Sequence, residues 1–282
     1  MKGRTVVVTG ATSGLGLAAS RSLAERGARV VLVGRNPDKA ERVRQDVIAA
    51  SGNENVTVQL ADLGLMSEVR KLAARLLESE PAIHVLVNNA AILPAERKLT
   101  AEGLEQTFAT NLLSPYLLTE LLLPRLRESA PARIVNVLSG GMYLSGIEPR
   151  DLEYARGDFD GSRAYARAKR ALMILTEQWA GELEESGVVV NAMHPGWADT
   201  PGVEGSLPGF YRLMRPLLRS PEQGADTITW LACAAEAGEA SGQFYLDREP
   251  HVTTVIPGTG GSARQRRELR ATLDEYITRP VD

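Results

Sequence analysis

The chain has 282 residues, of which 44% are hydrophobic and 24% charged, and its 32 basic and 35 acidic side chains leave a formal net charge of -3. This composition is that of an average soluble globular protein, so it excludes disordered and fibrous classes and argues against general nucleic-acid binding. Cys233 is the only cysteine and the three histidines lie far apart in sequence, so neither a disulfide framework nor a Cys/His metal cluster is expected.

No targeting or membrane segment is predicted. The sequence has no run of about 18 apolar residues, the length that a membrane span requires. A strand pattern already begins at Thr5, which leaves no room for a signal peptide before it. We therefore expect a cytoplasmic protein with no integral membrane segment.

Short β-branched, apolar runs alternate with segments of helical periodicity from end to end. The predicted strands are residues 5–9, 29–33, 56–60, 83–88, 133–138, 188–193 and 243–246. The predicted helices lie near residues 15–26, 38–50, 67–79, 101–128, 163–185 and 222–235. Helices between successive strands indicate parallel pairing through crossovers, and strands that are apolar on both sides require cover on both faces.

This pattern predicts an α/β protein: a single-domain Rossmann fold, with a doubly wound parallel sheet of about seven strands and helices on both faces. We expect residues 1–135 to form mainly a cofactor-binding half and residues 136–250 a catalytic and substrate-binding half, followed by a C-terminal extension over 251–282. In such a sheet, ligands bind beyond the carboxyl ends of the strands. Small and polar residues follow six of the predicted strands, which directs attention to those loops.

The first of these loops is rich in glycine. It joins the first strand to the first helix and reads Thr9-Gly-Ala-Thr-Ser-Gly-Leu-Gly16. Glycines permit the tight turn and the close approach of backbone to phosphate, and the helix N-terminus offers unpaired N–H groups and a positive dipole end. The spacing differs from the usual dinucleotide fingerprint, and a purely structural turn is the alternative. The candidate pyrophosphate-binding residues are Gly10, Thr12, Ser13, Gly14, Leu15 and Gly16.

The second loop bears on the choice between NAD and NADP. Enzymes that bind NAD commonly place an acid at the end of the second strand, where it holds the ribose 2′-hydroxyl. Here Gly34 and Arg35 occupy that position. Glycine leaves room for a 2′-phosphate and arginine binds it by a charge-assisted, bidentate contact, unless Arg35 is only a solvated surface side chain. We predict a preference for NADP (NADPH), with NAD as the alternative.

The third and fourth loops supply further candidate cofactor contacts. Asp62, followed by Leu63, ends the third strand. Its carboxylate is placed to accept from the adenine amino group or, alternatively, to cap the next helix. Asn89 and Ala90 follow the fourth strand, where small residues let the backbone approach the adenosine ribose.

Tyr165 and Lys169 stand four positions apart near the start of a long predicted helix, so they share one face of it. A free tyrosine, with a pKa of about 10, exchanges protons poorly at neutral pH. A nearby lysine ammonium stabilises the phenolate and lowers that pKa toward the working range. The pair therefore indicates proton transfer, although a surface Tyr-x-x-x-Lys pair is also common by chance.

Taken in order along the chain, these motifs resemble the short-chain dehydrogenase/reductase family. The resemblance covers nearly the whole chain and rests on Thr9-Gly-x-x-x-Gly-x-Gly16, Asp62-Leu63, Asn88-Asn-Ala-Ala91, Asn111, Ser139, Tyr165-x-x-x-Lys169 and Pro195-Gly196. It implies hydride transfer between nicotinamide C4 and a carbinol or carbonyl carbon. It also implies a homodimer or homotetramer, formed through the long helices that carry Asn111 and Tyr165.

The resemblance further implies roles for individual residues. Tyr165 is expected to be the acid/base, Ser139 to hold the substrate oxygen, and Lys169 to bind the nicotinamide ribose and to lower the tyrosine pKa. The residues expected beside the nicotinamide are Pro195, Gly196 and Thr200, the last on its carboxamide.

Asn111 is expected to anchor a water that connects Lys169 to solvent. Pro115 lies four residues later in the same helical pattern and cannot donate to the Asn111 carbonyl, which would leave that oxygen available to the water. A proline kept only to bend the helix is the alternative.

The chain departs from the simplest family members between Ser139 and Tyr165, which lie further apart here. The extra stretch, residues 146–161, is expected near the cleft. The candidate substrate contacts are Tyr154, Phe159, Trp197, Phe210 and Met214. The apolar side chains after the sixth strand favour a lipophilic carbonyl or alcohol, although an ordinary amphipathic helix explains them equally well.

These observations predict an NADP(H)-preferring oxidoreductase, a carbonyl reductase or alcohol dehydrogenase, that acts on a small-molecule substrate and uses no metal. A non-catalytic NAD(P)-binding sensor or scaffold is the alternative, but it would need only the first half of the chain. Near the C-terminus, the arginines within residues 264–270 predict a solvated helix, with a membrane-surface contact as the alternative.

Overall fold

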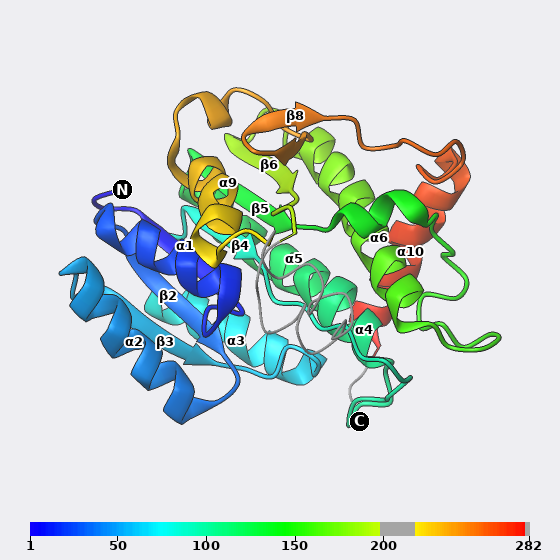
Figure 1. The fold of residues 1–282 in the computed structure, drawn as a ribbon, viewed down its shortest axis with the longest axis horizontal. Coiled ribbons are helices and arrows are strands. Elements are labelled where there is room, and N and C mark those ends of the chain that lie inside the picture. The colour runs from blue at the N-terminus through cyan, green and yellow to red at the C-terminus, as the bar shows by residue number, and fades with distance from the viewer. Residues whose placement is uncertain (198–217, 280–282) are drawn as a thin grey trace.

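The computed structural model describes residues 1–197 and 218–279 (Figure 1). They form one eight-stranded sheet with helices on both faces. The strands are β1 (Thr5–Thr9), β2 (Arg29–Gly34), β3 (Val56–Leu60), β4 (Val85–Asn88), β5 (Ala132–Val137), β6 (Val188–Met193), β7 (Phe244–Leu246) and β8 (Glu249–His251). The α-helices of the described residues are α1 (Gly14–Glu25), α2 (Pro37–Ser51), α3 (Met66–Ser79), α4 (Gln106–Phe108), α5 (Ser114–Glu128), α6 (Gly161–Glu182), α9 (Pro221–Cys233) and α10 (Ala263–Thr278).

The sheet has the strand order β3-β2-β1-β4-β5-β6-β7-β8, and every pair is parallel except β7 with β8. Register is continuous across its centre, where Val7 of β1 lies opposite Val31 of β2 and Leu86 of β4. The chain reverses its direction of progress between β1 and β4, so the crevice for a ligand opens at the carboxyl ends of these two strands. The predicted doubly wound sheet is confirmed.

Successive residues of the central strand point into two different cores. Val6 and Val8 pack into the core under α1, α2 and α9, whereas Val7 packs into the core shared with α3, α5 and α6. All three are fully buried, which for a valine stabilises the fold by about 1.5–3 kcal/mol relative to exposure. Because helices cover both faces of the sheet, the strand residues that point to either face are apolar, as the sequence pattern predicted.

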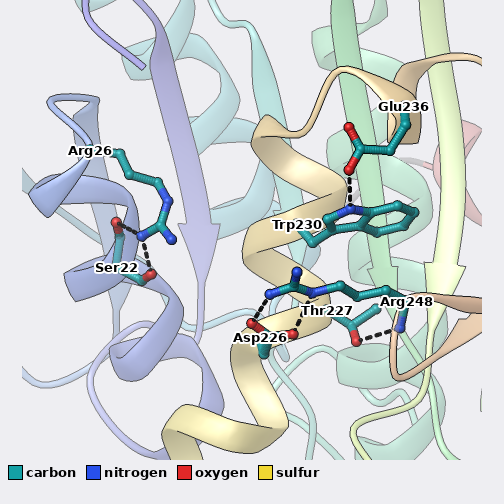
Figure 2. A network of polar contacts seen from close by, with 7 residues as sticks. All are labelled: Ser22, Arg26, Asp226, Thr227, Trp230, Glu236 and Arg248. Carbon is teal, nitrogen blue, oxygen red and sulfur yellow. Dashed lines mark hydrogen bonds and ion pairs between the residues drawn. The ribbon is translucent and has the colours of Figure 1, made fainter.

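β8 is the strand that the sequence pattern did not predict. Its residues, Glu249–His251, are exposed and lack apolar alternation. The strand forms because Asp247 and Arg248, with φ of 53° and 65°, make a two-residue turn that folds the chain back along β7. Figure 2 shows how this turn is anchored to α9: Arg248 Nε donates to Asp226 at 2.7 Å, and its backbone N–H donates to Thr227 Oγ1 at 3.2 Å.

Most helix predictions agree with the structure to within two or three residues, but the single helix predicted over residues 101–128 is wrong at its start and is interrupted. Gly103, at φ 76°, closes a turn where the helix was expected, and the helix begins only at Gln106. After α4 the backbone passes through a π-helical segment, η1 (Ala109–Leu113), before it continues as α5. The Glu105 side chain caps the start of α4 by accepting from two backbone N–H groups at 2.8 and 2.7 Å.

α10 begins with Ser262 as the N-cap of a capping box and lies alongside α6 (Figure 1). The predicted arginine-bearing helix is confirmed, but it is not wholly solvated. Leu269 and Leu273 are fully buried, and Arg270 donates to Glu120 of α5 at 2.7 Å. Within residues 1–197 and 218–279, no helix combines the length and the apolar composition needed to cross a membrane.

Candidate functional site

The loop that follows β4 fixes the shape of the glycine-rich loop between β1 and α1. Thr9 Oγ1 accepts from the backbone N–H groups of Asn89 and Ala90 at 2.9 and 3.1 Å. The Asn89 side-chain amide donates to the carbonyls of Thr9 and Gly10 at 2.8 and 3.3 Å. The Asn89 side chain therefore supports the glycine loop, a role that its position in the sequence did not reveal. Its direct contact with a cofactor stays a prediction.

The glycine loop forms a cradle that has no room for a side chain at Gly10 or Gly16. A Cβ on Gly16 would lie 2.4 Å from the Gly10 carbonyl oxygen and 2.5 Å from Asn89 Nδ2. Helix α1 begins at Gly14, its N-cap Ser13 makes no side-chain capping bond, and its first turn holds no acidic residue. The first N–H groups of the helix and its positive dipole end thus lack a side-chain anion, and the cradle fits a pyrophosphate.

Arg35 lies directly after β2, at the position predicted for a 2′-phosphate. Its guanidinium is 3.6 Å from the Asp62 carboxylate, and its side chain is 77% exposed. An ion pair this open to solvent contributes little to stability, so exchanging Asp62 for a phosphate costs little. β2 lies close to the glycine loop at Gly34. A Cβ on Gly34 would lie only 2.6 Å from the Thr12 methyl group.

Asp62 does not cap the next helix, so that alternative is wrong. Its Oδ1 accepts from the backbone N–H two residues on, at 2.9 Å, in a tight turn. The N-cap of α3 is Leu65, and the N–H groups of Met66 and Ser67 donate instead to the Glu102 carboxylate at 2.6 and 2.9 Å. Glu102 comes from a distant loop, so no local pattern could indicate it. Leu63, beside Asp62, is buried.

Asn111 lies in the π-helical segment η1 and is fully buried. Its side chain pairs with the backbone of Ile92 in both directions: Oδ1 accepts from the N–H and Nδ2 donates to the carbonyl, each at 2.8 Å. Local π-helical turns interrupt the regular hydrogen-bond ladder and often mark functional sites. Pro115 follows in α5, and the role of the Asn111 carbonyl in holding a water stays a prediction.

Three of the predicted catalytic side chains come together between β5 and α6. Ser139 lies two residues after β5, as the N-cap of a short 3-10 helix, and forms a side-chain hydrogen bond with the Tyr165 hydroxyl. Lys169, one turn further along α6, places Nζ 5.6 Å from the centre of the Tyr165 ring and 2.8 Å from the carbonyl oxygen of Val137, to which it donates. The side chain of Lys169 is buried, and within the described residues no carboxylate forms an ion pair with it.

Burial shifts both proton-transfer groups toward their neutral forms. It raises the pKa of Tyr165 to about 12, although the Ser139 hydrogen bond acts in the opposite direction. It lowers the pKa of Lys169 to about 7. The lowered tyrosine pKa expected from the lysine charge is therefore not seen in the protein alone. Desolvation is the largest effect on Tyr165, and it favours the neutral phenol.

The turn over residues 195–197, after β6, is held by Arg219 and Asp247, neither of which is among the predicted site residues. The Arg219 backbone N–H donates to the Trp197 carbonyl at 2.8 Å, and its guanidinium lies against Gly196, where a Cβ would be 2.9 Å away. Arg219 also forms a two-point ion pair with Asp247 in the β7–β8 turn, one contact being 2.8 Å. These residues are far apart in sequence, so only the fold could bring them together.

The predicted substrate contacts are only partly placed. Tyr154 and Phe159 pack on each other edge to face at 5.4 Å, and Arg167 lies 4.5 Å from the Tyr154 ring centre. Trp197 is 55% exposed. Thr200, Phe210 and Met214 lie outside the described residues. Within the described residues, no three His, Cys, Asp or Glu side chains converge as metal ligands would.

Comparison with known proteins identifies the family. A family model for short chain dehydrogenases matches residues 4–208. The chain belongs to the short-chain dehydrogenase/reductase family. Family membership makes it an NAD(P)-dependent oxidoreductase that acts on CH–OH and C=O groups.

Curated relatives in this family cover nearly the whole chain. Dehydrogenase/reductase SDR family member 12 of Homo sapiens is 41% identical over 276 residues, which span 98% of this chain and 86% of the relative. Retinol dehydrogenase 11 of Homo sapiens is 37% identical over 284 residues, 100% of this chain and 88% of the relative. One similar crystal structure is described as an NAD(P)-dependent gluconate 5-dehydrogenase from Beutenbergia cavernae, with NADP bound at low occupancy. Its sequence is 26% identical, the match covers 93% of this chain and 98% of that one, and the TM-score is 0.72.

The glycine cradle predicts a steep effect of a single methyl group. Gly16→Ala places a Cβ 2.4 Å from the Gly10 carbonyl, so the loop must move and dinucleotide affinity should fall by at least about tenfold. Gly181→Ala is the matched control, because that helical glycine has no atom within 4 Å of its would-be Cβ, and the variant should gain about 0.5–1 kcal/mol of stability. Calorimetric titration with NADPH measures the first effect and urea unfolding the second. Unchanged NADPH affinity in Gly16→Ala would remove the glycine loop from the cofactor site.

The buried lysine predicts a pH-dependent stability. Because the Lys169 pKa is about 7 in the folded chain and 10.5 normally, between these values the unfolded chain holds a proton that the folded chain lacks. Stability relative to Lys169→Met should therefore rise with pH across this window, by up to about 1.4 kcal/mol per pH unit. Urea unfolding at several pH values measures the slope. The exposed Lys71→Met serves as control, and a wild-type slope equal to that of Lys169→Met would show that the buried amine keeps its ordinary pKa.

Proposed function

We propose that the protein is an NADP(H)-preferring carbonyl reductase or alcohol dehydrogenase in which Tyr165 is the acid/base. The observation that carries this proposal is the convergence of Ser139, Tyr165 and Lys169 beside the carboxyl ends of β5 and β6. A bound NADPH would supply the hydride to the carbonyl carbon. The side chains of this chain would then handle only the proton and the substrate oxygen.

The three side chains divide that work by their positions. The Ser139 hydroxyl would hold the substrate oxygen next to the Tyr165 hydroxyl, with which it is already hydrogen-bonded. Tyr165 would give its phenolic proton to that oxygen as the C–O⁻ charge develops. The phenolate would then be stabilised by Lys169 in its protonated form and regain a proton from it. In the oxidation direction the same steps run in reverse.

The raised pKa of Tyr165 supports reduction as the readier direction at neutral pH. With a pKa of about 12, the phenol is protonated at pH 7 and ready to act as an acid. Oxidation instead needs the phenolate, so its rate should increase as pH rises. A positive charge on a bound nicotinamide and on Lys169 would bring the tyrosine pKa down when the base form is required.

Three observations support NADP over NAD. β2 ends at Gly34 and is followed by Arg35 with no acid at that point, Arg35 is exposed, and its ion pair with Asp62 is weak and open to solvent. A bidentate contact to a 2′-phosphate would replace this pair with a stronger one. A structure with 26% identity was solved with NADP, which agrees with this preference.

The substrate proposed here is a lipophilic carbonyl compound or alcohol. The similarity to retinol dehydrogenases, which by name act on an apolar alcohol, supports this class. A cytoplasmic location and a homodimer or homotetramer stay predictions. An oligomer built on the long helices α5 and α6 would have to accommodate α10, which already packs against both.

Tyr165→Phe should remove the proton donor and leave the cofactor site in place. We expect kcat for carbonyl reduction to fall by about 10²–10⁴, the usual contribution of a positioned general acid. NADPH affinity, measured by calorimetry, and the thermal midpoint should stay close to those of the wild type. Wild-type turnover in this variant would contradict the acid/base assignment.

Arg35→Ala should separate the two cofactors. Loss of a charge-assisted contact to the 2′-phosphate should weaken NADPH binding by about ten- to a hundredfold and leave NADH binding nearly unchanged. The control is Arg42→Ala, which removes an exposed arginine of similar charge from the neighbouring helix α2. An equal loss of affinity for NADPH and NADH, or an equal loss of NADPH affinity in both variants, would show that Arg35 does not bind the 2′-phosphate.

A further inference from the structure

The two segments that lengthen this chain contact each other. One is the connection over residues 146–161, between Ser139 and Tyr165, and the other is the C-terminal helix α10. Arg150 and Glu268 form an ion pair at 3.3 Å, and the Tyr276 hydroxyl donates to Glu153 Oε1 at 2.6 Å.

Glu153 links this contact to the start of the helix that carries Asn111. Its second oxygen, Oε2, accepts from the backbone N–H of Glu105 at 3.0 Å. Glu105 in turn caps α4 and is itself buried. The Tyr276 ring packs edge to face on Phe108 of the same helical turn, with ring centres 4.8 Å apart. One carboxylate thus joins the connection, the C-terminal helix and the entry to the π-helical segment.

α10 is anchored independently of this contact, so it can act as a fixed support. Leu269 and Leu273 are fully buried, and Arg270 pairs with Glu120 of α5 and lies 5.0 Å from the centre of the Tyr116 ring. The side-chain amide of Gln178 on α6 donates to the α10 backbone at 3.0 Å. The position of Tyr276 is therefore set by α5 and α6, the helices that frame the site.

The connection is also closely packed at its far end. Gly161 begins α6, and a Cβ there would lie 2.0 Å from the carbonyl oxygen of Pro94, which belongs to the loop after β4. Arg97 of that loop donates to the Glu153 carbonyl at 3.3 Å. A shift of Glu153 would therefore be passed to α6, four residues before Tyr165.

We propose that Tyr276 and Glu153 are positioning residues for the substrate side of the active site. Through their contact, α10 holds the 146–161 connection against the Asn111-bearing helix, and so holds the wall between Ser139 and Tyr165 in place. This inference rests on the proposed function, because it concerns where a carbonyl substrate is held. The dinucleotide cradle lies on other loops and should not depend on it.

Tyr276→Phe tests the contact with little risk to folding, because it removes one hydroxyl and keeps the ring on Phe108. Glu153→Gln removes the charge and keeps the shape of the acceptor. The matched control is Tyr245→Phe, which makes the same change in the core on the opposite face of the sheet. Three quantities are compared: amide hydrogen exchange of residues 105–113 and 146–161, KM and kcat for a medium-chain aldehyde, and the Kd of NADPH.

We expect both variants to exchange about tenfold faster in those two segments and to raise the aldehyde KM about tenfold, the size of effect expected from losing a hydrogen bond to a charged group. The kcat and the NADPH Kd should change little, and the control should change neither exchange nor KM. The double variant should be no worse than Glu153→Gln alone, since Glu153→Gln already weakens the contact that Tyr276→Phe removes. Faster exchange without a KM change would show a purely structural contact and would overturn the proposal, as would unchanged exchange.

The outcome also separates this inference from the proposed function. If the wild type binds NADPH and reduces the aldehyde, and Tyr276→Phe has the same aldehyde KM as the wild type, then only the positioning role is overturned. A wild-type chain that neither binds NADPH nor reduces any carbonyl compound overturns the proposed function, and the positioning role with it.

Discussion

A parallel sheet that is covered by helices on both faces can present its loops to a ligand only at its ends. Here that constraint places the glycine loop, Arg35, Asp62 and Ser139 along the one edge where parallel strands all finish. The reversal of strand order between β1 and β4 opens the crevice, and Thr9 bridges the two strands with hydrogen bonds to the β4 loop. The cofactor cradle is therefore a consequence of how the sheet is wound.

Burial and charge oppose each other around Lys169 and Tyr165. Lys169 lies in the interior with the Val137 carbonyl as its hydrogen-bond partner, which satisfies one donor but supplies no counter-charge. Desolvation then favours the neutral amine and the neutral phenol of Tyr165. Such a pair responds strongly to any new charge placed beside it, because the surroundings screen that charge weakly. A bound nicotinamide would change the protonation of both groups together.

The two additions to the chain are best understood together. The connection over 146–161 lies between Ser139 and Tyr165, and its far end packs against the loop after β4. α10 adds a second restraint by packing on α5 and α6 and by reaching Glu153 through Tyr276. The same helix contacts α5 through Arg270 and α6 through Gln178.

The sequence by itself determined the sheet, the glycine cradle and the placement of Tyr165 and Lys169 on one helix face, because these depend on local patterns: apolar runs of strand length, glycines after a strand, and two side chains four positions apart on a helix. It did not determine β8, the start of α4, the cap of α3 or the support of the 146–161 connection. Each of these rests on contacts between distant residues, such as Arg248 with Asp226, Glu102 with Met66 and Tyr276 with Glu153. Nor could the pattern give the pKa directions, since desolvation depends on how deeply the folded chain encloses a group, and only the tertiary structure decided that Lys169 is buried and that Tyr165 is partly buried.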